Sequence, residues 1–168
     1  MMRRGRKLGL EVSRASVVNH NRARQRTLAW LMALIMGIIT TPLAAAGCSL
    51  AATGVAFGNY DFLSPTDLEG VGNIQVQCDA VASYTITLSQ GYGLFDARRM
   101  MSGAHQLSYN LYSDAARTII WGDGIDGITQ VVGGNDAGQT YPVYAKAPAG
   151  QSPYVGTYTD SITVTLTF

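Results

Sequence analysis

The chain has few of the residues on which catalytic and nucleic-acid-binding sites depend. From residue 47 onward it contains one histidine, His105, and neither a Gly-x-Ser-x-Gly nor a His-Glu-x-x-His motif. These absences exclude the common serine-hydrolase and zinc-hydrolase templates. The same stretch has four Lys or Arg residues against ten Asp or Glu, a net charge of −6. It therefore offers no basic stripe for nucleic acid, and we expect neither an enzyme nor a cofactor.

Oxygen donors that could bind calcium are present in residues 123–136, but not at the spacing of a known loop. Asp123 and Asp126 are each followed by glycine. This pattern departs from the EF-hand loop, and Asp-Gly pairs commonly form turns. Trp121, just before them, is either an exposed platform for sugar stacking or a core aromatic, and the core position is the more common one. Trp121, Asp123 and Asp126 form the candidate ligand loop, with ordinary turn chemistry favoured and no metal predicted.

Long hydrophobic runs are also missing, apart from one near the N-terminus. Residues 28–39 are apolar, follow eight Lys or Arg residues and precede Ala44-Ala45-Ala46. The run is shorter than the about 20 residues of a membrane-spanning helix. The arrangement predicts a secretory signal peptide over residues 1–46, cleaved after Ala46, with a start downstream of Met1 as an alternative. Residues 47–168 then form one exported domain.

Only two cysteines occur, Cys48 and Cys78, and both lie in the exported part. In an oxidising compartment an even count predicts a disulfide, and this pair allows one bridge. Two buried free thiols are one alternative. Lipidation of Cys48 is another, because residues 45–48 loosely resemble a lipobox, although it would leave Cys78 unpaired.

Helical periodicity is absent from residue 47 onward, where short alternating segments predict an all-β sandwich or barrel. The clearest segment ends the chain: apolar residues alternate there with Ser and Thr, and an open edge of such a half-buried strand needs a partner. Its inward face is predicted to consist of Ile162, Val164, Leu166 and Phe168. A turn is predicted at residues 133–136, and an edge strand or bulge at Pro142. The other predicted strands are residues 49–57, 73–79, 83–89, 97–101, 106–112, 118–121 and 127–132.

Tyr158 stands two residues before Asp160 at the start of the terminal strand. In immunoglobulin-like sandwiches a tyrosine near such a strand start bonds back to the backbone at the sheet corner. We therefore expect Tyr158 and Asp160 to form a structural corner rather than a ligand site.

Taken in order, these segments resemble the spore coat protein U domain family, which includes the subunits of archaic, Csu-type chaperone-usher pili. The resemblance covers almost all of residues 47–168. It is carried by Cys48, Phe57-Gly58-x-Tyr60-Asp61, Val76-x-Cys78, Leu88-Ser89-x-Gly91, Arg99-x-Met101, Leu107-x-Tyr109-x-Leu111-Tyr112-x-Asp114, Trp121-Gly122-Asp123-Gly124, Pro142-Val143-Tyr144 and Gly156-x-Tyr158-x-Asp160.

The resemblance implies an immunoglobulin-like β-sandwich that lacks its seventh strand, with a Cys48 to Cys78 bridge joining its first two strands. The missing strand leaves a groove beside the terminal strand. A periplasmic chaperone is expected to fill this groove first, and the N-terminal extension of a neighbouring pilin subunit, delivered at an outer-membrane usher, is expected to replace it.

The sequence departs from fibre-forming pilins at its N-terminus, because cleavage after Ala46 leaves only Gly47 before Cys48. Such a chain accepts a donor strand but has none to give. We hypothesise a chain-terminating tip subunit involved in adhesion or biofilm formation, or a tip adhesin whose ligand binds the loops of residues 121–136. A mature N-terminus near Ile38 would remove the basis for the terminating role. The alternative is a self-sufficient spore-coat or cell-surface matrix protein.

Overall fold

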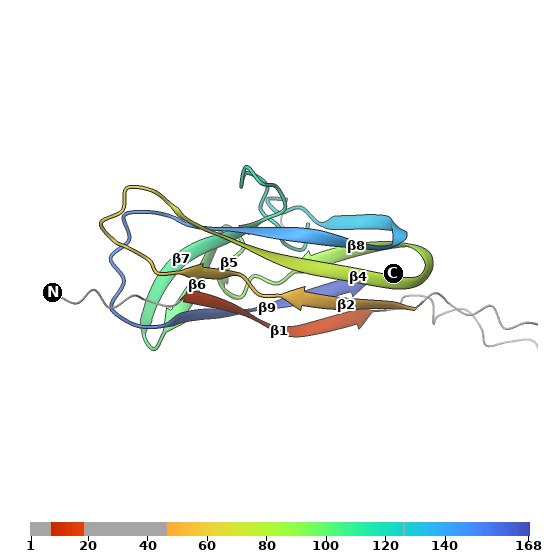
Figure 1. Cartoon of the computed structure of the whole chain (residues 1–168), viewed down its shortest axis with the longest axis horizontal. Coiled ribbons are helices and arrows are strands. Elements are labelled where there is room, and N and C mark those ends of the chain that lie inside the picture. Colours follow the sequence, from red (N-terminus) through yellow and green to blue (C-terminus); the bar gives the residue numbers. More distant parts are fainter. Residues whose placement is uncertain (1–7, 19–46, 126) are drawn as a thin grey trace, which may run out of the picture.

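The strands of this chain form one elongated all-β body (Figure 1). The computed structural model describes residues 8–18 as backbone, and residues 47–125 and 127–168 with their side chains. No helix in these ranges has the length and apolar character of a membrane span. The strands are β1 (Leu8–Val18), β2 (Cys48–Thr53), β3 (Ala56–Gly58), β4 (Leu68–Leu88), β5 (Tyr92–Leu94), β6 (Ala97–Ser102), β7 (His105–Tyr112), β8 (Val132–Ala147) and β9 (Tyr158–Thr167).

The strands follow the order β2-β4-β8-β7-β6-β9-β1-β3, with β5 added to β6. The long strand β4 takes part in both layers. Its middle residues pair with β2, whereas its end, from Thr85 to Leu88, pairs with β9 between Thr167 and Val164. This second pairing links β4 directly to β9, so the strands β4-β8-β7-β6-β9 close on themselves like a barrel. The all-β prediction is confirmed.

The core is made by the alternating residues that the sequence singles out. Buried residues alternate with outward-facing ones along β9 and most of β4 and β7; the exceptions are residues 79–83 of β4, none of which is buried, and Asn110 of β7, which is buried between Tyr109 and Leu111. Burial of each large apolar side chain contributes about 1.5–3 kcal/mol, which is why the period-two pattern determines the inward face. The confirmed inward residues include Ile74, Val76, Cys78, Tyr84, Ile86, Leu88, Leu107, Tyr109, Leu111, Ile162, Val164 and Leu166.

The turn predicted at residues 133–136 is wrong. These residues belong to β8 and pair with the end of β4, where Tyr84 lies opposite Gly134 and Thr85 opposite Gly133. A Cβ atom at Gly134 would lie 2.7 Å from the Tyr84 hydroxyl. Glycine is present because a tyrosine crosses close to the backbone, and not because the chain turns. The predicted strands at residues 73–79 and 83–89 are likewise parts of the single strand β4.

Two further details of the strand prediction need correction. Pro142 lies inside β8 opposite Asn73, not on an edge strand, but the ladder from β8 to β7 ends at Tyr144. The missing N–H of Pro142 therefore interrupts no described ladder on that side. The segments predicted as strands at residues 118–121 and 127–132 contain only isolated bridges, Tyr112 to Ile120 and Trp121 to Gln130, before β8 begins.

Candidate functional site

The candidate site is the outer edge of β9. One edge of β9 pairs antiparallel with β6 and β4. The opposite edge pairs, among the described residues, with β1 alone, in parallel from Leu8 opposite Tyr158 to Val18 opposite Thr167. In Figure 1, β1 lies along β9 over its length. Without residues 8–18, β9 would be an edge strand with a row of unpaired backbone groups.

The inner wall of this edge is apolar. Ile162, Val164 and Leu166 are at most 3% exposed, and Phe168 is partly buried against the same core. The opposite rim of the groove is β3, whose Gly58 and Ala56 pair with the start of β1. We refer to the space between β9 and β3 as the β9 groove. The structure thus places Ile162, Val164 and Leu166 on the strand that borders the groove, and Phe168 directly after its end.

The interior beneath the β9 groove is not completely filled. A void of about 20 Å³ lies between the layers and is lined by core side chains and by Thr53. Ile162 and Val164 contribute to it from β9, and Val55 from the segment just before β3. Two residues of β9 therefore border space between the layers that no side chain fills.

The start of β9 is anchored by the carboxylate of Asp160, which is 2% exposed. It accepts hydrogen bonds from the Tyr109 hydroxyl at 2.6 Å, the Ser161 amide at 2.7 Å and the Tyr92 amide at 3.1 Å. Burial raises the pKa of Asp160, whereas these hydrogen bonds act to lower it. The carboxylate links β5, β7 and β9, so it holds the base of the groove strand in place.

Gly91 has no room for a side chain beside this carboxylate. Its φ is +62°, and a Cβ atom there would collide with the Asp160 carboxylate and approach Ile162 Cδ1 to 2.7 Å. We expect Gly91→Ala to lower the free energy of unfolding by more than about 1 kcal/mol, as measured by urea denaturation. Gly103→Ala is the matched control, because its φ is +59° but nothing lies within 4 Å. Equal losses in both variants would show that Asp160 imposes no packing constraint.

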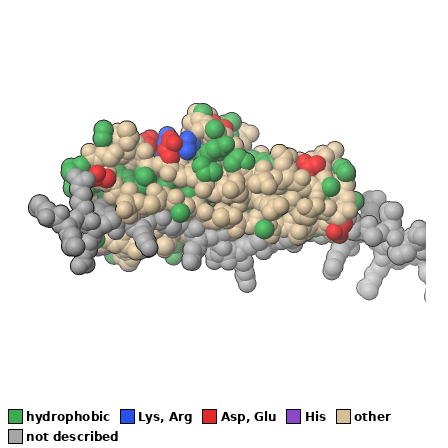
Figure 2. Space-filling view, viewed as in Figure 1, with side chains coloured by type: hydrophobic (Ala, Val, Ile, Leu, Met, Phe, Trp, Pro, Cys, Tyr) green, Lys and Arg blue, Asp and Glu red, His purple; other side chains and the backbone are tan. Residues whose placement is uncertain are grey.

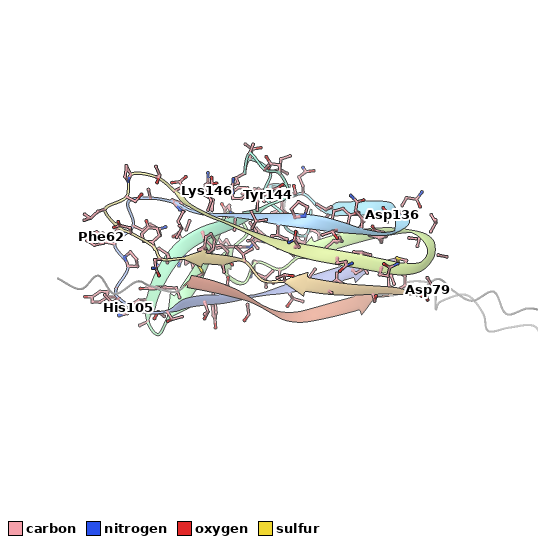
Figure 3. The ribbon with its side chains drawn as sticks, viewed as in Figure 1. Phe62, Asp79, His105, Asp136, Tyr144 and Lys146 are labelled. Carbon is pink, nitrogen blue, oxygen red and sulfur yellow. A yellow bond between two sulfur atoms is a disulfide. The ribbon has the colours of Figure 1, made fainter. Side chains whose placement is uncertain are left out.

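Tyr158 lies at the corner where the loop of residues 148–157 enters β9. Its ring is fully buried, and its hydroxyl donates to the Tyr154 carbonyl at 2.9 Å. This is the backward bond to the backbone of a tyrosine corner. Beside it, the exposed ring of His105 stacks on that of Tyr154 with 4.1 Å between centroids. Figure 3 shows His105 and Phe62 at the same end of the sandwich.

Arg98 is a fully buried cation that the sequence does not reveal. It donates to Asn110 Oδ1 at 2.7 Å and to the Trp121 and Ser89 carbonyls at 2.8 and 2.9 Å. Burial lowers its pKa. Its Nε has no hydrogen-bond partner within the described part of the chain. Because Arg98 is followed by Arg99, the local pattern cannot say which of the two faces inward.

The candidate ligand loop is not a surface platform. Trp121 is fully buried and donates through Nε1 to the Ile86 carbonyl at 3.1 Å, so it is a core aromatic. The Asp123 carboxylate accepts the Ile125 amide at 3.0 Å, which is turn chemistry. Asp126 lies outside the described residues. No group of three or more His, Cys, Asp or Glu residues suited to a metal occurs in the described ranges.

Cys48 and Cys78 form a disulfide. They lie directly opposite each other on β2 and β4, with a Cα–Cα distance of 4.0 Å. The bridge holds the first residue of β2 against the sheet, close to the end of the sandwich that bears Asp79 and Asp136 (Figure 3). Because both sulfur atoms are used, the free-thiol and lipidation alternatives are incompatible with this structure.

Comparison with known proteins agrees with the family predicted from the sequence. A sequence model of the Spore Coat Protein U domain matches residues 37–165. The chain belongs to the Spore Coat Protein U domain family. A relative of this chain, Protein U of Myxococcus xanthus, is 36% identical over 132 residues, covering 67% of this chain and 70% of the relative. The predicted family is confirmed, and the chain is a structural protein rather than an enzyme.

Solved structures show a similar fold. The chain resembles the CsuC-CsuE chaperone-tip adhesion subunit pre-assembly complex from archaic chaperone-usher Csu pili of Acinetobacter baumannii, with a TM-score of 0.51 and 20% identity. The match covers 74% of this chain and 40% of that chain, so the chain spans about two fifths of its length. The E. coli Hda pilus minor tip subunit HdaB matches at 15% identity over 71% of this chain and 79% of its own, but with a TM-score of only 0.36. The first match supports the immunoglobulin-like architecture.

Proposed function

We propose that this chain is an exported structural subunit of an archaic chaperone-usher pilus, and that its β9 groove accepts a strand from a partner. The observation that carries the proposal concerns the outer edge of β9. None of the described strands within residues 47–168 pairs with this edge. An alternating apolar strand laid there gains main-chain hydrogen bonds and buries its side chains over Ile162, Val164 and Leu166. A donor supplying three or four such residues contributes energy comparable with the stability of a domain.

The partners in this proposal follow from the groove. A periplasmic chaperone covers the β9 edge during export, an outer-membrane usher receives the complex, and a neighbouring pilin subunit then supplies the permanent strand. The face shown in Figure 2 carries few charged side chains. Within the described residues of this domain, two ion pairs neutralise charges: Arg117 pairs with Glu69 at 2.9 Å and Lys146 with Asp67 at 3.7 Å. A weakly charged surface suits recognition through backbone and apolar contacts more than through charge steering.

More specifically, we propose that the subunit terminates the pilus at its tip and takes part in adhesion or biofilm formation. It depends on cleavage after Ala46, which leaves no donor strand ahead of Cys48. The family match begins at residue 37, upstream of that position. N-terminal sequencing of the exported protein therefore decides between an acceptor alone and a subunit that also donates.

The function is tested by producing residues 47–168 in the periplasm with and without a chaperone of this pathway. We expect an aggregation-prone protein alone and a soluble one-to-one complex with the chaperone. Removal of Thr167 and Phe168 should abolish capture by the chaperone, because it shortens the wall of the β9 groove. The variant Phe168→Leu keeps the wall at full length and should still be captured. Thermal unfolding and size-exclusion chromatography are the measurements.

A self-sufficient coat or matrix protein is the second candidate. The pairing of β4 with β9 favours it, because this pairing closes the sheet without help from outside the domain. The relative named Protein U is 36% identical to this chain over 132 residues. A stable monomer of residues 47–168 that unfolds cooperatively without any partner would support this candidate and contradict the pilus subunit.

A further inference from the structure

We propose that the chain carries a binding site for neutral oligosaccharides on the outer face of its sheet, in a hollow where the end of β4 meets β9. The hollow has a volume of about 320 Å³ and is bordered by residues of both strands and of two loops. It is separate from the β9 groove, because it lies on the outward face of these strands and not along the outer edge of β9. The inference goes beyond the proposed function, which assigns no small-molecule ligand to the chain.

The floor of the hollow consists of hydroxyl groups. Thr87 of β4 lies opposite Thr165 of β9, and Ser89 continues the ladder by donating its amide to the Thr163 carbonyl at 2.9 Å. The residues between them on each strand are buried, so these four side chains belong to the outward face. A hydroxyl both donates and accepts hydrogen bonds. The floor therefore suits a ligand that carries hydroxyl groups of its own.

The walls of the hollow are Phe95 and Asp123, which are both half-buried. Phe95 is the first of the two residues that connect β5 to β6. The Asp123 carboxylate accepts the Ile125 amide at 3.0 Å, which uses one of its several acceptor positions. An aromatic ring can pack against the apolar C–H face of a sugar, while a carboxylate accepts hydrogen bonds from its hydroxyls. Floor and walls together thus offer the contacts that a pyranose ring requires.

The buried side chain of Arg98 holds the parts of the hollow together. Its guanidinium donates to the Ser89 carbonyl in the floor and to the Trp121 carbonyl, two residues before Asp123. It also lies over the Phe95 ring, 5.4 Å from the ring centroid. Each contact fixes a different segment that borders the hollow, and Trp121 contributes only its backbone. Such a preformed site loses little conformational entropy when a ligand binds, so Arg98 is a positioning residue for the site.

A second hollow of about 290 Å³ adjoins the first. The two hollows share Ser89 and Gln90, and the second is bordered by Tyr92, whose side chain is 57% exposed. Each hollow therefore has its own aromatic ring. The exposed amide of Gln90 lies between them and provides both a donor and an acceptor. This repetition favours a ligand of two or more sugar units over a single one.

The charge of the site selects against acidic sugars. Asp123 lines the first hollow and Asp160 the second, and none of the described residues lining either hollow is Lys or Arg. Residues 47–168 as a whole have a net charge of −6. A uronic or sialic acid would bring a further carboxylate to this surface without a cation to pair with it. The chemistry of the site is therefore that of a neutral oligosaccharide.

The first test applies the full chain to an array of immobilised neutral oligosaccharides, with oligosaccharides that contain uronic or sialic acid on the same array. We expect binding to neutral members and weaker or no binding to acidic ones. Absence of binding, or a preference for the acidic oligosaccharides, would overturn the proposal.

The second test locates the site by measuring the Kd of the best-bound neutral oligosaccharide by calorimetry. Asp123→Asn keeps the shape of the side chain but removes its charge, and should raise Kd about tenfold or more. Thr87→Val removes one hydroxyl from the floor and should raise Kd about threefold. Thr85→Val is the matched control, because Thr85 is exposed on the same face of β4, two residues earlier, but does not line the hollow. It should leave Kd unchanged.

All three variants should keep the Tm of the natural chain, because the substitutions lie on the surface. Binding that is unaffected by both Asp123→Asn and Thr87→Val, or that Thr85→Val weakens equally, would overturn the assignment to this hollow. Neither result concerns the β9 groove, because capture by the chaperone is measured separately and does not involve this face.

Discussion

Replacement of Trp121 by alanine is expected to lower the free energy of unfolding by about 3–5 kcal/mol. The indole is fully buried, so truncation removes apolar contacts and leaves a cavity that the surrounding strands can only partly fill. It also removes the donor for the Ile86 carbonyl. Because the neighbouring backbone carbonyl of Trp121 accepts a hydrogen bond from buried Arg98, local collapse would disturb that network as well. Urea denaturation of the full chain is the measurement.

Ile125→Ala provides the control for Trp121, because it lies in the same segment but is 86% exposed. Its free energy of unfolding should change by no more than about 0.5 kcal/mol. If a glycan or surface ligand is found, its binding should persist in Trp121→Ala protein that remains folded. Loss of binding with unchanged stability would contradict the assignment of Trp121 to the core.

Loss of the Cys48–Cys78 bridge is the second large expected effect. The double substitution Cys48→Ser and Cys78→Ser should lower the free energy of unfolding by about 3.5 kcal/mol, because the bridge restricts the unfolded chain. The sequence separation of 30 residues sets this magnitude in the chain-entropy account. The bridge also holds the start of β2, so its loss should free that end of the strand.

Reducing agent separates the bridge from other effects of the substitutions. The natural chain in reductant should unfold at the denaturant concentration of the double variant, whereas the variant should not respond to reductant. Ser49→Ala, at the adjacent exposed position of β2, should change stability only slightly, through its hydrogen bond to the Gln77 carbonyl. Equal stability of the oxidised and reduced natural chain would show that the bridge is dispensable.

Much of the fold could be predicted because alternation is a local property. Along most of β4, β7 and β9 the apolar residues recur at every second position. Because such a strand buries one face, this pattern determines which side chains point into the core. The same reasoning identified Ile162, Val164 and Leu166 as one wall. The family could be recognised from motifs distributed over the domain, and the two cysteines allowed one pairing.

The failures share a physical cause. Gly133 and Gly134 carry the composition of a turn, but their conformation is decided by Tyr84 on the neighbouring strand, which needs space that only glycine leaves. Arg98 and Arg99 are identical in the local pattern, and only the acceptors supplied by Asn110, Ser89 and Trp121 turn the first one inward.

The sequence by itself determined the all-β class, the inward face of the terminal strand, the disulfide pair and the family. The tertiary structure decided which strand lies beside which, and therefore that the outer edge of β9 is paired by residues 8–18. Alternation specifies the face that a strand buries, but the backbone groups along its edges are the same for every residue. A strand's neighbours are consequently set by the packing of the whole chain. The resemblance implied a groove beside the terminal strand, and the packing showed that β9 and β3 border it.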